Sequence, residues 1–430
     1  MTTKGGLISS VKNRLLHKKI SSGIHLVAEK IPKFFSFSLG LFINHGSRDE
    51  NPEDNGITHL LEHMLFKGTS QKSSLDIVKL IEGLGGSFDA YTTKENLIIS
   101  TKFLSEHMTR VFQLIIELLV ESKIADSELK KEKSVILEEI KSSNDDPGDH
   151  IFDLIFQALF PHHTMGLPIA GTKQSVRRFD AARTKTHYRR LLKSDMVLAI
   201  SGNFDEQNLL ALSQKAFGEH TAHAVERTKP PHHAQRYIVE KKSEISQVHV
   251  VFGVPGVAYT SSLRYPFSII NTAFGGGMSS RLFQGLREQE GLVYNVQSFI
   301  DLYSDCGVSG FYFICDKRNV PKVARQLRRI FNDISKKGFD KDEIELAKTY
   351  LSGNLLLSLE SSTNRMLRLG REMTYLGENV PIESMINTIR GISTEQVNAL
   401  IPDYLDPTAF TIAAIGPVTE KYIRETFTFE

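Results

Sequence analysis

Two histidines and a glutamate in residues 56–68, Gly-Ile-Thr-His-Leu-Leu-Glu-His-Met-Leu-Phe-Lys-Gly, have the types and spacing of a metal site. His59 and His63 are four residues apart, and Glu62 lies three residues after His59. On a helix, such residues project from neighbouring positions along one side. A catalytic zinc site needs three protein ligands and a position for water. The spacing therefore predicts that His59 and His63 bind zinc while Glu62 accepts a proton from that water.

The helical segment 127–141 offers two carboxylates as the third ligand, Glu138 and Glu139. Glu138 shares its helix face with lysines and serines, a solvated set, whereas Glu139 lies beside the apolar edge. We therefore predict Glu139 as the ligand. Glu132 lies two turns earlier on nearly the same face, where it is either a supporting carboxylate or a solvated charge in a run of Lys and Glu.

The chain that must position these residues has 430 residues, of which 40% are hydrophobic and 24% charged, and its net charge is +2. This length is sufficient for two domains or more, and the charge balance argues against a dedicated nucleic-acid binder. No apolar run approaches the ~20 residues of a membrane helix, and the N-terminus lacks the apolar core of a secretory signal. We expect a cytoplasmic protein. The Lys, Arg and Ser residues at the start make a transit segment, and hence the mitochondrial matrix, the alternative.

The two cysteines, Cys306 and Cys315, do not have the spacing of a zinc knuckle. They lie close together in a strand-like region, so we expect a reduced, buried pair. Any metal must then be bound by histidines and carboxylates.

The two halves of the sequence repeat a strand and helix pattern. MVLAISGNFDEQNLLALSQKAF, from Met196, resembles FTIAAIGPVTEKYIRETF, from Phe410. FSLGLFINHG, from Phe37, resembles VHVVFGVPG, from Val248, at roughly the same offset. The long helical segments expected between the strands include Ser73–Gly83, Glu106–Glu121, Asp126–Ser142, Val320–Lys337 and Asp340–Leu357. These patterns predict an α+β fold of two similar domains, each a mainly antiparallel sheet covered by helices.

A polar stretch without periodicity, which contains Pro230-Pro231, lies near the middle of the chain. Such composition is typical of a linker between domains. We therefore expect an N-terminal zinc-binding domain at 1–220, a linker at 221–236 and a C-terminal domain without zinc at 237–430.

The block GSRDENPEDNGITHLLEHMLFKGT, followed by VILEEI, resembles the pitrilysin/insulinase family of zinc metallopeptidases, the inverzincins, whose motif is His-x-x-Glu-His. Within this family, the chain is similar to the half-length bacterial peptidases and mitochondrial processing peptidase, which have a LuxS/MPP-like metallohydrolase fold. The resemblance covers nearly the whole chain. It implies one zinc ion per chain, bound by His59, His63 and Glu139. It also implies that Glu62 is the general base and that Glu132 assists catalysis.

The second half lacks HxxEH and resembles the inactive repeat that completes the substrate site. There, Arg287 and Tyr294 occupy positions at which relatives bind substrate near the scissile bond, and both side chains can donate hydrogen bonds to peptide carbonyls. Without the resemblance, they would be interpreted as a helix-end cation and a strand residue. The glycines 275–277 are assigned no catalytic role.

Residues 85–95 resemble the edge strand on which relatives lay the substrate as an added β-strand. This resemblance implies that Asp89 and Ala90 contact the substrate. Asp89 stands where the family usually has Asn. A carboxylate only accepts hydrogen bonds, so either the contact differs or a cationic substrate group is favoured.

Together these features predict a zinc-dependent endopeptidase that hydrolyses peptides or unfolded protein segments inside a clamshell chamber. Long family members contain four such domains in one chain, so the resemblance implies a homodimer in which Arg287 and Tyr294 act in trans. The alternatives are a presequence-processing peptidase, a non-catalytic structural or partner subunit, and a heterodimer with a degenerate relative. The intact set of metal residues favours the enzyme.

Overall fold

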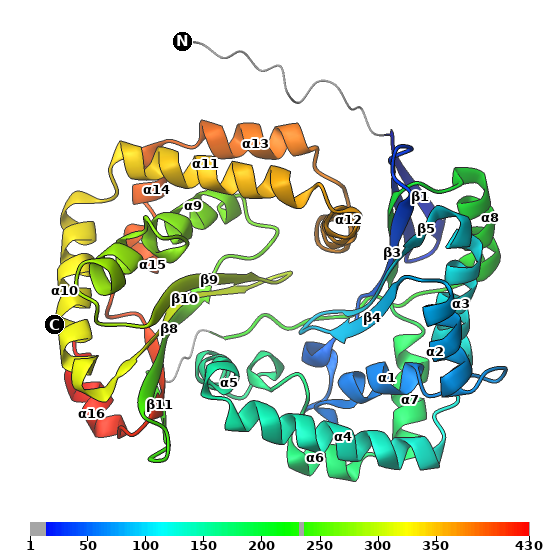
Figure 1. Cartoon of the computed structure of the whole chain (residues 1–430), viewed down its shortest axis with the longest axis horizontal. Helices are drawn as coiled ribbons and strands as arrows, with labels where there is room; N and C mark the ends of the chain where they lie inside the picture. Colours follow the sequence, from blue (N-terminus) through cyan, green and yellow to red (C-terminus); the bar gives the residue numbers. More distant parts are fainter. Residues whose placement is uncertain (1–13, 232–235, 430) are drawn as a thin grey trace. The chain divides into compact units, whose positions relative to one another are not determined.

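A computed structural model describes residues 14–231 and 236–429. Within them the chain forms two compact units, and each contains one mainly antiparallel sheet covered by helices, as the sequence predicts (Figure 1). The described residues of unit 1 are 14–140, 168–227 and 356–383. Those of unit 2 are 141–167, 228–231, 236–355 and 384–429.

The sheet of unit 1 has the strand order β1-β2-β6-β3-β5-β4. Its strands are β1 (Arg14–Ser21), β2 (Ile24–Lys30), β3 (Ser36–Ile43), β4 (Ser87–Thr92), β5 (Leu97–Leu104) and β6 (Met196–Gly202). Only β2 and β6 are parallel neighbours among these strands. The hydrophobic strands β3, β5 and β6 lie in the interior of the sheet, whereas β4 lies at one edge.

The sheet of unit 2 has the order β7-β11-β8-β10-β9. Its strands are β7 (Tyr237–Lys241), β8 (Gln247–Gly256), β9 (Asn295–Leu302), β10 (Gly307–Asp316) and β11 (Thr411–Gly416). Again one pair is parallel, β7 with β11, and the other neighbours are antiparallel. Strands β6 and β11 therefore hold the same place in the two sheets, as do β3 and β8, which confirms both halves of the predicted repeat.

Helices of unit 1 flank its sheet on two sides (Figure 1). They are α1 (Ile57–Leu65), α2 (Ser74–Gly83), α3 (Met108–Glu121), α4 (Asp126–Asp145, which continues into unit 2), α6 (Lys173–Arg178), α7 (Ala181–Leu191), α8 (Glu206–Phe217) and α12 (Ser362–Leu376). The larger core contains buried residues of α1, α3, α4, α7 and α8 together with one face of the sheet. Helix α12 covers the other face.

The helices of unit 2 are α5 (Pro147–Leu159), α9 (Arg264–Gly275), α10 (Val320–Lys337), α11 (Lys341–Ser358), α13 (Ile382–Gly391), α14 (Thr394–Asn398), α15 (Ile401–Tyr404) and α16 (Glu420–Thr426), with the ends of α11 and α13 shared with unit 1. Short helical turns are η1 (Ser47–Asp49), η2 (Pro52–Asp54), η3 (Ser105–His107), η4 (Thr164–Gly166), η5 (Phe283–Glu288, a π-helix) and η6 (Lys317–Asn319). Cys306 and Cys315 are buried, reduced cysteines of this unit, as expected. No helix in the described part of the chain is both long and apolar enough to cross a membrane.

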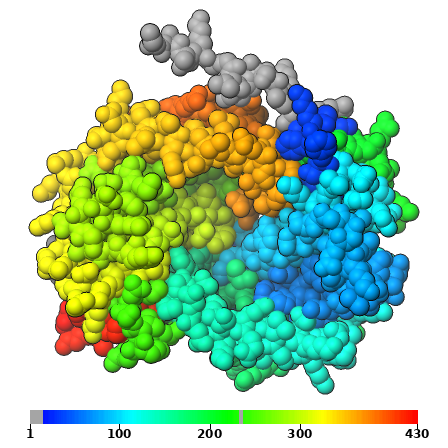
Figure 2. All heavy atoms as spheres, viewed as in Figure 1, coloured from blue at the N-terminus to red at the C-terminus, as the bar shows by residue number. Residues whose placement is uncertain are grey.

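The two units exchange one helix each. Helix α12, from the second half of the sequence, packs on β3 and β6 in unit 1, where its orange ribbon and atoms lie against blue and cyan segments (Figures 1 and 2). Helix α5, from the first half, packs on β8 and β11 in unit 2. Each sheet needs apolar cover on both faces, and these helices supply the second cover.

Two glycines allow the exchanged helices to approach closely. A Cβ atom at Gly40 in β3 would lie 2.3 Å from the sulfur of Met366 in α12. A Cβ atom at Gly253 in β8 would lie 2.7 Å from Cγ1 of Ile155 in α5. The backbone of each sheet therefore contacts a side chain of its covering helix directly.

The compact units draw on segments that are not contiguous, whereas the sequence predicts continuous domains at 1–220 and 237–430. Periodicity identifies a helix and its apolar face but not the sheet that the face covers. Residues 232–235 of the expected linker, and most of the expected transit segment, lie outside the described residues. As boundaries of folding domains, the expected ranges stay a prediction.

Candidate metal centre

Helix α1 is fixed in unit 1 by its apolar side. Its apolar residues are each at most 2% exposed: Ile57, Leu60, Leu61, Met64 and Leu65. The helix begins after Gly56, whose φ of 93° is the left-handed conformation that favours glycine. A Cβ atom there would lie 2.6 Å from the carbonyl oxygen of Ala170. The sequence thus fixes both the start of the helix and the side that faces the core.

A buried carboxylate, Glu50, holds the N-terminus of α1. Its two oxygens accept 2.8 Å hydrogen bonds from the backbone N–H groups of Gly56 and Thr58. Burial raises the pKa of Glu50 to about 7, and the hydrogen bonds from Thr58 and Gly56 oppose this rise. The Thr58 hydroxyl also lies 3.0 Å from Nε2 of buried His187. This end of the helix therefore rests on polar contacts made inside the protein.

His59, Glu62 and His63 project from the other side of α1 and are half-buried. Each offers one potential ligand atom, and these atoms lie within 4.8 Å of one another. Nδ1 of His59 is buried without a hydrogen-bond partner in the described part of the chain. Burial, with a smaller effect of nearby His63, lowers the pKa of His59 to about 4, so this imidazole is neutral at pH 7. Neutral imidazole is the form that binds metal.

Helix α4 brings Glu132 and Glu139 to the two nitrogens of His63. Oε2 of Glu132 lies 3.1 Å from Nδ1, and Oε2 of Glu139 lies 3.5 Å from Nε2. The Glu132 side chain is 6% exposed and that of Glu139 is 46% exposed. Lys67 forms a 2.8 Å ion pair with the other oxygen of Glu132. Glu132 can thus orient the His63 ring through Nδ1, while Nε2 faces the Glu139 carboxylate.

The residues fit a zinc ion. Two imidazoles and one carboxylate are the donor set of many catalytic zinc sites. An unpartnered buried nitrogen on His59 and a carboxylate close to Nε2 of His63 are consistent with a shared cation. Glu138, the alternative to Glu139, is exposed as Glu139 is, so the choice of Glu139 rests on its 3.5 Å approach to Nε2 of His63.

Glu62 has the environment of a proton acceptor. Burial raises its pKa, whereas a hydrogen bond from Thr92 and the proximity of His63 lower it. The Thr92 hydroxyl donates this bond to Oε2 of Glu62 over 2.6 Å. Thr92 is the last residue of β4, so the edge strand touches the candidate base through its final side chain.

The predicted substrate residues of unit 1 lie on the same strand. In β4, Asp89 pairs with Ser100 and Ala90 with Ile99 of β5. Asp89 is exposed. Among the described strands, β4 has a neighbour on one side only, so its other edge can pair with an extended peptide.

Arg287 and Tyr294 lie in unit 2. Arg287 is in η5, with its guanidinium carbon 5.0 Å from the ring centroid of Phe283. Tyr294 immediately precedes β9 and is 74% exposed. These positions leave both residues accessible, and their role at a metal site stays a prediction.

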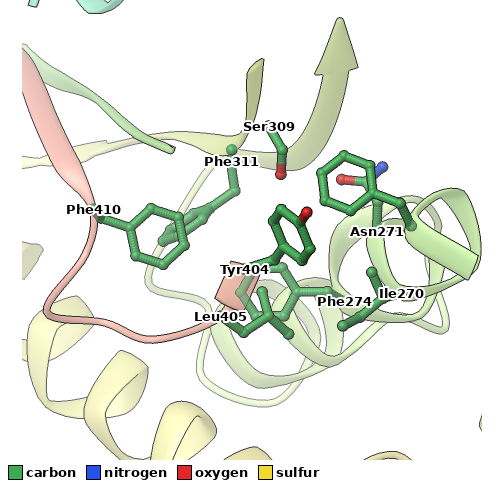
Figure 3. Close-up of a pocket in the computed structure, with 10 residues that line it drawn as sticks. Ile270, Asn271, Phe274, Ser309, Phe311, Tyr404, Leu405 and Phe410 are labelled. Atoms are coloured by element: carbon green, nitrogen blue, oxygen red, sulfur yellow. The ribbon is translucent and has the colours of Figure 1, made fainter. Parts of the chain in front are cut away.

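Unit 2 contains an apolar hollow beside α9 (Figure 3). Its volume is about 10 Å³, close to the space that one water molecule needs. Aromatic rings dominate its lining, from Phe267, Phe274, Phe311, Tyr404 and Phe410. It is part of the aromatic core and offers no titratable cluster for catalysis.

Two contacts at the centre were not anticipated from the sequence. Lys67 follows His63 by four residues but lies two residues beyond the end of α1, so helix spacing does not determine its side. Thr92 had no sequence signal either, because its contact with Glu62 depends on how β4 packs against α1.

Comparison with known proteins assigns the family. Residues 26–173 match the insulinase (peptidase family M16) model, and residues 182–351 match the peptidase M16 inactive domain. An uncharacterized zinc protease of Streptomyces coelicolor is 33% identical over 94% of this chain and 89% of its own. The uncharacterized zinc protease YmxG of Bacillus subtilis is 33% identical over 92% and 97%. This chain is a half-length member of the M16 peptidase family.

A solved structure shows the same fold. A protease from Helicobacter pylori matches with a TM-score of 0.85 and 16% identity, covering 94% of this chain and all of that chain. The two-sheet architecture predicted from the sequence is therefore shared with a protein of solved structure at low sequence identity.

Proposed function

We propose that this protein is a zinc-dependent endopeptidase that hydrolyses peptides or unfolded protein segments. The single observation that carries the proposal is the convergence of His59, Glu62 and His63 with the α4 carboxylate Glu139 in a chain of the M16 family. His59, His63 and Glu139 would hold one zinc ion. When bound, zinc lowers the pKa of a coordinated water to about 7 and polarises the substrate carbonyl.

Residues of the chain carry out proton transfer, orient His63 and bind the substrate. Glu62 takes a proton from the attacking water and returns it to the leaving amine. Glu132 holds the His63 ring through Nδ1, and Lys67 neutralises the charge of Glu132. The open edge of β4 binds the peptide backbone, which gives affinity that depends little on side chains.

For the complete enzyme, we propose a homodimer that closes as a clamshell. In it, Arg287 and Tyr294 of one copy bind the scissile region of a peptide held by the other copy. A chamber of this kind admits peptides and unfolded segments and excludes folded proteins. Cytoplasmic location belongs to the same proposal.

A presequence-processing role is the second candidate, and exposed Asp89 on β4 favours it. Its carboxylate can pair with a basic substrate residue, which Asn at this position would not do as strongly. Comparing wild type with Asp89→Asn on matched basic and neutral peptides tests this role. If Asp89→Asn cleaves basic peptides more slowly than wild type but neutral peptides at the same rate, the role is supported. If the substitution changes the cleavage of neither peptide set, the role is contradicted.

The decisive experiment measures metal content and peptide cleavage by wild type, Glu62→Gln, Glu139→Gln and Glu138→Gln. We expect one zinc per chain in wild type, Glu62→Gln and Glu138→Gln, and depleted zinc in Glu139→Gln. Cleavage of an unstructured peptide library should fall by at least about 10³-fold in Glu62→Gln. Zinc-free wild type, or unchanged cleavage by Glu62→Gln, would overturn the proposal and favour a non-catalytic partner subunit.

A further inference from the structure

The residue that touches Glu62 immediately precedes the turn between β4 and β5. Thr92 closes β4, and its hydroxyl gives Oε2 of Glu62 a 2.6 Å hydrogen bond. A hydroxyl beside a carboxylate must donate, so the bond fixes the direction of one Glu62 oxygen. Thr92 pairs with Leu97 at the end of the β4–β5 ladder, directly beside the turn, so the ladder and the turn together determine where this donor lies.

Hydrogen bonds between its own residues close the turn, which consists of residues 93–96. The backbone N–H of Thr93 donates to the carbonyl oxygen of Asn96 over 2.7 Å. The backbone N–H of Asn96 donates to the Thr93 hydroxyl over 2.9 Å. These two bonds define the conformation of residues 93–96 but do not fix the turn to the rest of unit 1.

Backbone contacts attach the turn to η1. The N–H of Ser47 donates to the carbonyl oxygen of Thr93 over 3.1 Å, and the N–H of Arg48 donates to that of Lys94 over 2.7 Å. Gly46 lies so close that a Cβ atom there would be 2.5 Å from the Lys94 carbonyl oxygen. The turn therefore follows any displacement of η1.

Two ion pairs with little exposure lock this attachment. Arg48 contacts Glu95 over 2.6 Å, with side chains 2% and 0% exposed. Arg227 donates two 2.8 Å hydrogen bonds to Asp49, whose side chain is 1% exposed. Arg227 also donates to the Glu95 carbonyl oxygen over 2.8 Å. We call Arg48, Asp49, Glu95 and Arg227 the turn clasp.

The clasp gathers segments that are remote in sequence. Arg227 comes from the stretch expected to be a polar linker, yet its side chain is only 11% exposed. Helix α12 adds Tyr375, whose hydroxyl oxygen accepts a 3.1 Å hydrogen bond from the Asn96 side chain. Burying such charges is costly unless they are paired in one geometry, so the clasp tolerates little movement of the turn.

We infer that Thr92 is a positioning residue for Glu62, and that the turn clasp holds Thr92 where it orients the base. This inference rests on the proposed peptidase function. It assigns a positioning role to Arg227 as well, which acts through the turn and Thr92 rather than by contact with substrate. The misplacement of a catalytic group by about 1 Å can cost roughly 10²-fold in rate.

The first test compares Thr92→Val, which keeps the shape and removes the donor, with Thr92→Ser, which keeps the donor. We expect Thr92→Val to lower kcat by about 10- to 100-fold with KM changed less than about twofold. Thr92→Ser should restore kcat to within about threefold of wild type. Thr186→Val, which removes an exposed hydroxyl on α7, serves as the matched control and should leave kcat unchanged. Zinc content and thermal unfolding should match wild type in all three variants.

The second test addresses the clasp without relying on activity. Arg227→Met should accelerate amide hydrogen exchange of Thr93 and Asn96 by at least about tenfold. Its effect on kcat should not add to that of Thr92→Val in the double variant, because both act on one contact. Unchanged exchange in Arg227→Met, or additive losses in kcat, would overturn the role of the clasp.

The outcomes separate this inference from the proposed function. An active wild type with fully active Thr92→Val would overturn the positioning role and leave the peptidase intact. A loss in Thr92→Val that Thr92→Ser does not restore would equally overturn it, because the hydroxyl would not be the cause. A zinc-loaded wild type that cleaves no peptide would overturn the proposed function and this role together.

Discussion

Helices α1 and α9 occupy matching places in the two units but carry different chemistry. Helix α1 follows β3 and α9 follows β8, and these strands hold the same position in their sheets. Buried and half-buried residues alternate along both helices in the same order from Ile57 and from Pro266. In that alignment, the half-buried His59, Glu62 and His63 correspond to Ser268, Asn271 and Thr272.

Two of the corresponding side chains in α9 form hydrogen bonds with backbone carbonyl groups of their own helix. The Ser268 hydroxyl donates to the carbonyl oxygen of Arg264 over 2.8 Å, and the Thr272 hydroxyl donates to that of Ser268 over 2.9 Å. In α1, Nδ1 of His59 has no partner among the described residues, and His63 contacts carboxylates of α4. The comparison teaches that the repeated fold supplies a presented helix face, while the residue types on that face determine whether it offers ligand atoms to a metal.

The largest expected effect is a difference in zinc affinity between variants of α1 and of α9. His63→Ala should weaken zinc binding by more than about 100-fold, because it removes a ligand and the partner of Glu132 and Glu139. Thr272→Ala, at the corresponding position of α9, should leave zinc binding unchanged. Isothermal titration of zinc-depleted protein with zinc measures both. Equal affinities in the two variants would break the proposed difference between the helices.

A smaller effect compares the two exchanged helices. At Gly40, an added methyl group would meet the flexible end of Met366, which can move aside, whereas at Gly253 it would meet Cγ1 of Ile155 near the backbone. Gly253→Ala should therefore lower the free energy of unfolding by about 2–3 kcal/mol and Gly40→Ala by about 1 kcal/mol. Gly353→Ala, with open space around it, is the control and should not destabilise. Urea unfolding measures the order, and a reversed order would contradict this packing argument.

The stability of unit 1 should depend on pH through its buried histidines. Burial is the main cause that lowers the pKa of His45 to about 4 and that of His187 to about 3, from an ordinary 6.5. Below pH 6.5 the unfolded chain therefore binds more protons at these sites, and stability falls as the pH falls. His45→Leu should reduce the loss between pH 7 and pH 5 by about 2 kcal/mol.

Urea unfolding of wild type and His45→Leu at both pH values measures this difference. The contribution of Glu50 to stability has the opposite pH dependence. Because its pKa is raised in the folded protein, this contribution is lost as the pH rises from 4.5 to about 7. Its contribution is common to both proteins and cancels in the comparison. Identical pH slopes for wild type and variant would show that His45 does not titrate as its burial requires.

The smallest effect is expected at an exposed ion pair of unit 2. Arg424 contacts Glu420 one turn away in α16, with side chains 61% and 49% exposed. Because solvent screens such pairs, Arg424→Ala should change the free energy of unfolding by less than about 0.5 kcal/mol. The comparison with buried Arg227→Met, measured by the same urea unfolding, sharpens the contrast between a solvated pair and the turn clasp. A larger loss in Arg424→Ala than in Arg227→Met would contradict it.

Local patterns predicted the elements that hold the candidate site. The expected helix 126–142 corresponds to α4, on which Glu139 lies 3.5 Å from His63 of α1, while its role as a metal ligand stays a prediction. The repeated strands from Phe37 and Val248 correspond to β3 and β8. These predictions succeeded because helix and strand periods depend on neighbouring residues alone.

Contacts between remote segments could not be predicted in this way. Arg227 lies in a polar stretch whose composition is typical of a linker, and only its partners Asp49 and Glu95 reveal that it is buried. The same holds for α12, whose amphipathic pattern is satisfied by any apolar surface. Which sheet it covers depends on tertiary packing that one sequence does not display.

The exchange of α5 and α12 determines when each unit can be completed during synthesis. The sheet of unit 1 is fully translated once Gly202 has been added, yet one of its faces waits for α12, which begins at Ser362. Until then, side chains such as Phe42 and Val197 are uncovered on the growing chain. A polypeptide that stops before α12 retains the zinc motif but exposes this apolar face to solvent. The N-terminal half is therefore a poor candidate for independent expression, and premature termination should yield an aggregation-prone fragment.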